Sequence, residues 1–236
     1  MKIIDKKTGK RFDNKDLELK SLNKILKEND PIIQNMEKVD NTEEFSPMSP
    51  PEAYDKDKAI GLDYKDASKI LKTYMDDHSG VIKEVEKFEK ALIEFKKKDF
   101  HFTKEINDTF NAFFVYFDNE ILPHNRDEER NLFPILHKRL VESGEVGVGK
   151  NPDSAVDLME DDHIKFIQLA ALTFNFLGLA SRLQDSNSRL LTYDIAYNTG
   201  KELVELIKLH IFREDNTLFP LAQKLLTNAD FELISE

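Results

Sequence analysis

The sequence predicts an all-α protein built around an up-down-up-down four-helix bundle, with an N-terminal extension. Three observations support this prediction. Only eight Gly and eight Pro occur among the 236 residues, and so few breakers favour long helices over a turn-rich β fold. Apolar residues recur at helical spacing over four long segments. The connections between these segments are short, which is typical of antiparallel neighbours in a bundle.

Residues 1–60 differ in composition from the rest of the chain and are predicted to form an extension and linker, partly irregular, ahead of a bundle over residues 61–236. One short helix ending at Pro31 is compatible with the segment NKDLELKSLNKILKEND. The next stretch, NTEEFSPMSPPEAYDKDK, is polar and contains three prolines, which is typical of a loop. The extension is therefore expected to lie outside the fold that carries the candidate site.

The first two predicted helices run from about residue 64 to 98 and from about residue 103 to 141. Asp63 is the expected N-cap of the first helix, because a short carboxylate side chain accepts well from backbone N–H groups there. Each helix carries one apolar stripe, and each stripe contains a histidine, His78 in the first and His124 in the second. Both histidines are therefore expected to point into the bundle.

The third and fourth predicted helices run from about residue 154 to 184 and from about residue 188 to 226. Ser154 and Asp157 resemble a capping box at the start of the third helix. The polar segments SGEVGVGKNPD and QDSNS are the expected connections before and after this helix.

A weak internal repeat carries the candidate site. His124-Asn-Arg-Asp-Glu128 and His210-Ile-Phe-Arg-Glu214 share the same His-to-Glu offset, and each is followed by Leu-Phe-Pro at the same distance. A further histidine, His78 or His163, precedes each motif by nearly the same number of residues. The first and second helices and the third and fourth helices are therefore predicted to be two versions of one hairpin.

This spacing brings metal-binding side chains together. Residues four apart in a helix differ by about 40° in direction, so the His and Glu of each motif point the same way. Two buried glutamates cannot stay ionised without positive charge nearby, and a pair of metal ions supplies it. Imidazole and carboxylate donors suit iron or manganese. The candidate ligands are His78, His124, Glu128, His163, His210 and Glu214.

Other residues have less specific interpretations. His101 and His137 are expected at the surface, because the first lies near a turn and the second points away from the metal face. Tyr74 and Glu120 lie one turn before His78 and His124. They are either groups that support the ligands, extra ligands, or bundle-lining residues without metal contact.

Two prolines, Pro134 and Pro220, fall inside helical patterns and are expected to kink their helices or to mark irregular turns.

On these motifs the chain resembles the hemerythrin-like, or HHE cation-binding, family over about residues 64–226. The resemblance implies a four-helix bundle with a non-haem di-iron centre, its irons joined by an oxo or hydroxo bridge, and manganese as the alternative metal. By the same resemblance the four histidines would be terminal ligands, and Glu128 and Glu214 would bridge. Oxygen-carrying members have a second histidine where this chain has Ile167. The pattern is more similar to the branch that repairs iron centres, although that branch carries a cysteine motif and this chain has no Cys.

The resemblance leads us to expect a protein that senses or reacts with nitric oxide, peroxide or oxygen, with a role in stress response or iron-centre repair. A reversible oxygen carrier or store is one alternative. Another is a metal-stabilised interaction module that contacts a protein partner through residues 1–60. Whether the chain is an enzyme stays open at this point.

Composition and charge argue against several kinds of site and partner. With no Cys, the chain can supply no disulfide, zinc–thiolate site or thiol nucleophile. The net charge of −11 disfavours binding to nucleic acid. We expect no apolar run to be long enough to span a bilayer, and the segment MKIIDKKTGKRF lacks the apolar core of a secretory signal. We therefore expect a cytoplasmic protein with no membrane partner.

Overall fold

The computed structural model describes residues 3–4, 11–12, 62–145 and 154–234. The chain divides into two compact units, Met1–Phe45 and Ser46–Glu236. In the first unit, strand β1 (Ile3–Ile4) pairs antiparallel with strand β2 (Arg11–Phe12). This strand pair was not predicted, because two residues are too few to show an alternating pattern. The short helix expected before Pro31 lies outside the described residues.

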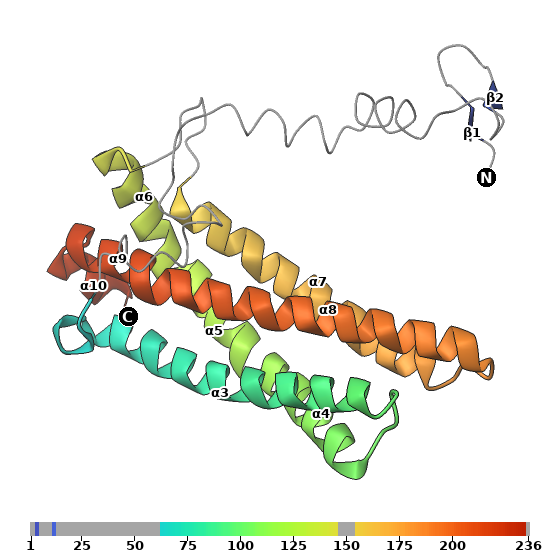
Figure 1. The fold of residues 1–236 in the computed structure, drawn as a ribbon. Helices are drawn as coiled ribbons and strands as arrows, with labels where there is room; N and C mark the ends of the chain where they lie inside the picture. Colours follow the sequence, from blue (N-terminus) through green and yellow to red (C-terminus); the bar gives the residue numbers. More distant parts are fainter. Residues whose placement is uncertain (1–2, 5–10, 13–61, 146–153, 235–236) are drawn as a thin grey trace. The chain divides into compact units, whose positions relative to one another are not determined.

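The second unit is all-α, which confirms the predicted fold class. Its long helices lie side by side in a bundle (Figure 1). Helix α8 packs against both α3 and α7, and α3 packs against α4. The up-down-up-down order and the domain boundary at residue 60 stay predictions. The helices are α3 (Lys69–Lys97), α4 (Lys104–Tyr116), α5 (Leu122–Asp127), α6 (Phe133–Ser143), α7 (Ala155–Ala180), α8 (Ser186–Arg213), α9 (Phe219–Leu225) and α10 (Asn228–Ile234).

The first helix of the bundle begins later than predicted. Asp63 caps only a short 3₁₀ turn, η1 (Tyr64–Asp66), by accepting a hydrogen bond from the Lys65 backbone N–H. Helix α3 follows with its own N-cap, Ser68, whose hydroxyl accepts from the Leu71 N–H. Two capping side chains in close succession thus separate the 3₁₀ turn from helix α3. The apolar periodicity alone predicted a single helix over both.

Three π-helical turns interrupt the second and fourth predicted helices. They are η2 (Phe117–Ile121), η3 (Glu128–Leu132) and η4 (Glu214–Leu218). In each, the backbone N–H that follows the turn donates to the carbonyl of the turn's first residue, five positions back. A proline stands two positions after each turn, at Pro123, Pro134 and Pro220.

These prolines and the widened turns belong together. Proline has no N–H to donate to the carbonyl four residues earlier, so a regular helical turn loses a hydrogen bond there. A π-turn changes the backbone hydrogen bonds of the residues just before the missing one. The irregular turns expected at Pro134 and Pro220 are confirmed, and Pro123 adds a third one that was not predicted.

The apolar core consists of two clusters. One contains Phe88, whose ring stacks on Phe113 with centroids 3.9 Å apart. The other contains Phe133 and Phe219. Along α3, buried His78 lies between Tyr74 of the second cluster and Val81 of the first. A layer of buried polar side chains therefore separates the two apolar clusters.

Helix α7 is long and apolar enough, by length and composition, to cross a membrane. No other helix of the described residues meets these criteria. This corrects the expectation that no apolar run reaches that length. Core helices of soluble proteins, which are mostly buried, meet the same criteria, whereas 33% of this apolar window is buried. The absence of a membrane partner stays a prediction. Large apolar side chains on the outward face of α7 are Ile164, Ile167, Leu172, Phe174 and Leu179.

The predicted capping box at the start of α7 is confirmed. The Ser154 hydroxyl accepts from the Val156 N–H, and the Asp157 carboxylate accepts from the Ser154 N–H. We expect Ser154→Ala to lower the free energy of unfolding by about 1 kcal/mol, because backbone donors of α7 lose their acceptor. Urea unfolding would measure this. Ser188→Ala, in the exposed first turn of α8, is the control, and equal effects of both changes would contradict the prediction.

Candidate metal centre

Four histidines converge as two pairs in the buried polar layer. The Nε2 atoms of His78 on α3 and His124 on α5 lie 3.1 Å apart. The Nε2 atoms of His163 on α7 and His210 on α8 also lie 3.1 Å apart. Three of these side chains are buried, and the His124 side chain is 8% exposed. The two halves of the sequence repeat thus supply one pair each.

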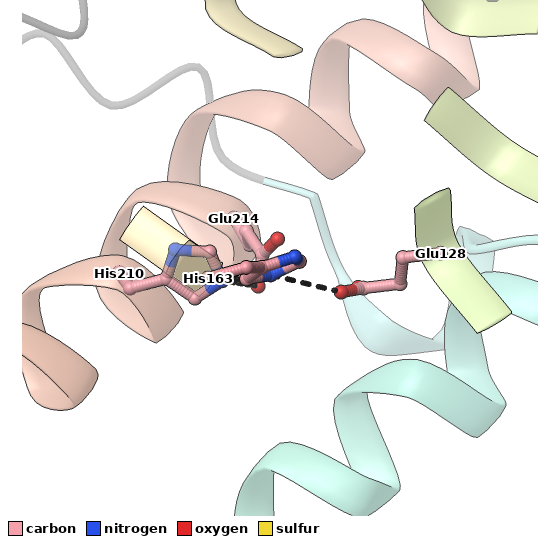
Figure 2. A group of neighbouring side chains, drawn as sticks. All are labelled: Glu128, His163, His210 and Glu214. Atoms are coloured by element: carbon pink, nitrogen blue, oxygen red, sulfur yellow. Dashed lines mark hydrogen bonds and ion pairs between the residues drawn. The ribbon is translucent and has the colours of Figure 1, made fainter. Parts of the chain in front are cut away.

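Two glutamates connect the histidine pairs. Glu128 places Oε1 at 3.5 Å from His124 Nε2 and Oε2 at 3.7 Å from His163 Nε2. Glu214 places Oε2 at 3.2 Å from the Nε2 atoms of both His78 and His210. Figure 2 shows His163, His210 and Glu214 close together, with Glu128 reaching toward them. Each glutamate therefore contacts one histidine of each pair, as a bridging carboxylate does.

The ligand-type atoms are close enough to surround metal ions. Those of Glu128, His163, His210 and Glu214 lie within 4.8 Å of one another. The same limit holds for His78, His124 and Glu128. Glu128 belongs to both groups, so the structure brings all six predicted residues to one place.

The π-turns help to explain the position of the glutamates. Glu128 is the first residue of η3 and Glu214 is the first residue of η4. In each case the glutamate carbonyl accepts from the N–H of the phenylalanine in the following Leu-Phe-Pro segment. The repeated Leu-Phe-Pro therefore marks a local backbone irregularity that begins at the candidate ligand, as π-turns often do at functional sites.

Every histidine of the centre has an acidic partner on its other ring nitrogen. The Nδ1–carboxylate distances are 2.8 Å for His78–Asp215, 3.3 Å for His124–Asp77, 2.9 Å for His163–Glu129 and 3.6 Å for His210–Asp162. At the three shorter distances the contact is a hydrogen bond, and it directs the opposite nitrogen, Nε2, at the centre. Nδ1 of His210 makes no hydrogen bond within the described residues. Three of the acidic partners thus orient their histidines toward the centre, and Asp162 lies beside the fourth.

These acidic partners were not predicted, although the repeat contains a signal for them. Asp77 and Asp162 directly precede the leading histidines, and Glu129 and Asp215 directly follow the glutamates. Asp77 and Asp162 lie beside the second histidine of their own half, which is on another helix. Glu129 and Asp215 lie beside the leading histidine of the other half. Sequence spacing shows that the acids recur, but only the packing of the helices shows which ring each one faces.

The buried groups of the centre shift one another's pKa values. Glu128 and Glu214 are fully buried, and none of their four carboxylate oxygens has a hydrogen-bond partner within the described residues. Burial, together with the charge of Glu214, raises the pKa of Glu128 well above its usual range. Burial also lowers the pKa of His163 to about 4. For His78 burial acts in the same direction, but Asp215 and Glu214 outweigh it and raise the pKa to about 10.

Unpartnered carboxylate oxygens beside inward Nε2 atoms are the donor set that iron or manganese takes. A cation would supply partners for the buried carboxylate oxygens. The residues present therefore fit a pair of metal ions.

The other predicted candidates lie outside this set. The Tyr74 hydroxyl donates to Asp127 at 2.7 Å, while its ring meets the His124 ring edge-on at 5.5 Å. Glu120 is exposed and lines an outer pocket of about 260 Å³. His101 is exposed at the turn after α3, and His137 on α6 bonds the Ser154 hydroxyl at 2.8 Å.

A small cavity adjoins the centre. It has a volume of about 10 Å³ and touches His78, His124 and His210. That is about the space one water molecule needs. The remaining lining residues are Val81, Ile121, Asn125, Phe166, Ile207 and Ile211.

The comparison with protein families gives one match. The family described as Hemerythrin HHE cation binding domain matches residues 69–222, from the start of α3 into α9. All six candidate ligands lie within the matched range. No curated protein and no solved structure matches the chain.

Proposed function

The chain belongs to the hemerythrin HHE cation-binding domain family, and from this premise we propose that it is a di-iron protein that senses or reacts with nitric oxide, peroxide or oxygen. His78 and His124 would hold one iron, and His163 and His210 the other. The two glutamates that contact both histidine pairs would bridge the irons. Manganese is the alternative metal, because the same donors suit it.

One observation carries this proposal. Within the described residues, four buried carboxylate oxygens lack hydrogen-bond partners and lie beside four Nε2 atoms, and an acid lies near the far nitrogen of each of these rings. Buried carboxylates are normally paired, so an arrangement of this kind indicates a cation. Iron at this place would supply a Lewis-acidic and redox-active centre for a small ligand.

The surrounding residues fix how such a centre is held. Hydrogen bonds from acidic partners keep Nε2 of His78, His124 and His163 directed at the centre. The two apolar clusters on either side limit access of water. Ile167, where oxygen carriers of this family have a further histidine, is 52% exposed on the outward side of α7. With two histidines and the shared glutamates on each iron, coordination positions remain for an added ligand. This favours sensing or reaction over reversible oxygen carriage.

Metal analysis of the purified protein tests the proposal. We expect about two irons per chain, as in other di-metal bundles, and a near-ultraviolet charge-transfer band that changes when nitric oxide is added. Rapid mixing of the reduced protein with oxygen should give irreversible oxidation. A stable and reversible oxygenated spectrum would favour a carrier instead. Protein that contains no iron and also refuses reconstitution with iron or manganese would contradict the proposal.

A further inference from the structure

The cavity beside the candidate metal centre has paired walls. Val81 and Phe166 each follow a leading histidine by three residues, and Ile121 and Ile207 each precede the second histidine of a half by three residues. These four residues are apolar and related by the internal repeat. The cavity therefore lies where the two halves of the repeat meet.

Asn125 is a polar residue of the cavity wall whose match in the other half of the repeat is apolar. It directly follows His124, and the matching position after His210 is Ile211. Both residues line the cavity, so one half contributes an amide where the other contributes a hydrocarbon side chain. Asn125 is the one cavity-lining residue other than the histidines that can donate a side-chain hydrogen bond.

The amide of Asn125 has no partner within the part of the chain that the structure describes. The residue is only 6% exposed, and its buried Nδ2 makes no hydrogen bond there. It lies on the short helix α5, between the π-turns η2 and η3. Buried polar atoms are normally satisfied, and Asn125 lines the cavity, so its unpartnered amide nitrogen is available to a small acceptor there.

We propose that Asn125 donates a hydrogen bond to a small, hydrogen-bond-accepting ligand in this cavity, of the class of diatomic gases and reduced oxygen species. The inference rests on the proposed function, because the ligand would bind beside the metal. The donor belongs to the half of the site that contains His124. The ligand would therefore accept a hydrogen bond from that half and have only an apolar contact at the matching position of the other half. Asn125 is thus a specificity-determining residue for ligands that can accept a hydrogen bond.

Nitric oxide is the probe for the test, because it has two atoms and the cavity is small. Asn125→Ile gives this half of the cavity the residue that the other half already has. In iron-loaded protein, we expect this change to raise the N–O stretching frequency of the bound probe and to weaken its binding by about 2- to 10-fold, the loss of one hydrogen bond. Ile211→Leu changes the shape of the matching wall without removing a donor, so its shifts should be smaller than those of Asn125→Ile.

The metal-free protein gives a second readout that does not depend on iron. Because Asn125→Ile removes a buried donor without a partner, we expect the melting temperature of the metal-free variant to rise. Equal frequencies and affinities in wild type and Asn125→Ile, both fully loaded with iron, would overturn the inference and leave the proposed function intact. Equal shifts in Asn125→Ile and Ile211→Leu would also overturn it, because cavity shape would then be the cause. Wild-type protein without iron would count against the proposed function itself.

Discussion

Glu128→Leu is expected to make the metal-free protein more stable and to abolish the stabilisation that metal provides. Glu128 is completely buried, and both of its carboxylate oxygens lack hydrogen bonds to any residue that the structure describes. A buried polar group without hydrogen bonds costs about 1–3 kcal/mol in desolvation, and an apolar side chain of similar volume removes this cost. The same change removes the side chain that contacts both histidine pairs, so added iron should no longer raise the melting temperature.

The opposite signs of the two effects make this prediction specific. For wild type, metal at about 100 times its dissociation constant should add about 2.7 kcal/mol to the free energy of unfolding for each site. Urea unfolding with and without metal would measure both effects, and elemental analysis would measure the iron content. The control is Glu202→Leu, at an exposed position on α8, which should shift stability by no more than about 0.5 kcal/mol. A metal-free Glu128→Leu protein that is less stable than wild type yet binds iron fully would show that Glu128 has a structural role instead.

The sequence predicted the parts of this protein that depend on local spacing. An i, i+4 pair such as His124 and Glu128 shares a helix face whatever the rest of the fold does. Repetition of that pair then identified the second half of the site. The outer limits of the second predicted helix, near residues 103 and 141, are close to those of the α4–α6 segment, 104–143.

The parts that were missed depend on contacts between helices or on very short elements. Asp215 faces His78 across a separation of 137 residues, which no periodicity reveals. The role of Asn125 depends on a cavity formed by several helices. Helix α10 is only seven residues long and was not predicted. Conversely, Pro134 indicated an irregular turn, but only the backbone bonds show that the turn begins at Glu128.

Two acidic partners at matching positions of the repeat, Asp162 and Asp77, are expected to behave differently when replaced by alanine. Asp162 is 1% exposed and accepts a hydrogen bond from Arg213, itself only 3% exposed, at 3.1 Å. Removing one partner of a buried ion pair costs about 3–5 kcal/mol, because the other charge stays buried without compensation. The Asp77 side chain is 52% exposed, so Asp77→Ala should cost little stability.

Metal affinity should respond differently from stability. Asp162 lies beside Nδ1 of His210, and Asp77 lies beside Nδ1 of His124. Because such partners orient a ligand ring, each alanine variant should lose about 10- to 100-fold in metal affinity. Urea unfolding of the metal-free proteins and competition with a chelator would measure the two quantities. Equal losses of stability in Asp77→Ala and Asp162→Ala would contradict the prediction.

A double variant separates the two roles of Asp162. Replacing Asp162 and Arg213 together by leucine removes both buried charges, so stability should return to within about 1 kcal/mol of wild type or exceed it. Metal affinity should stay low, because His210 still lacks the carboxylate beside its Nδ1. Recovery of both quantities would show that Asp162 acts only as the counter-ion of Arg213. Recovery of stability alone would show that the carboxylate also orients a metal ligand.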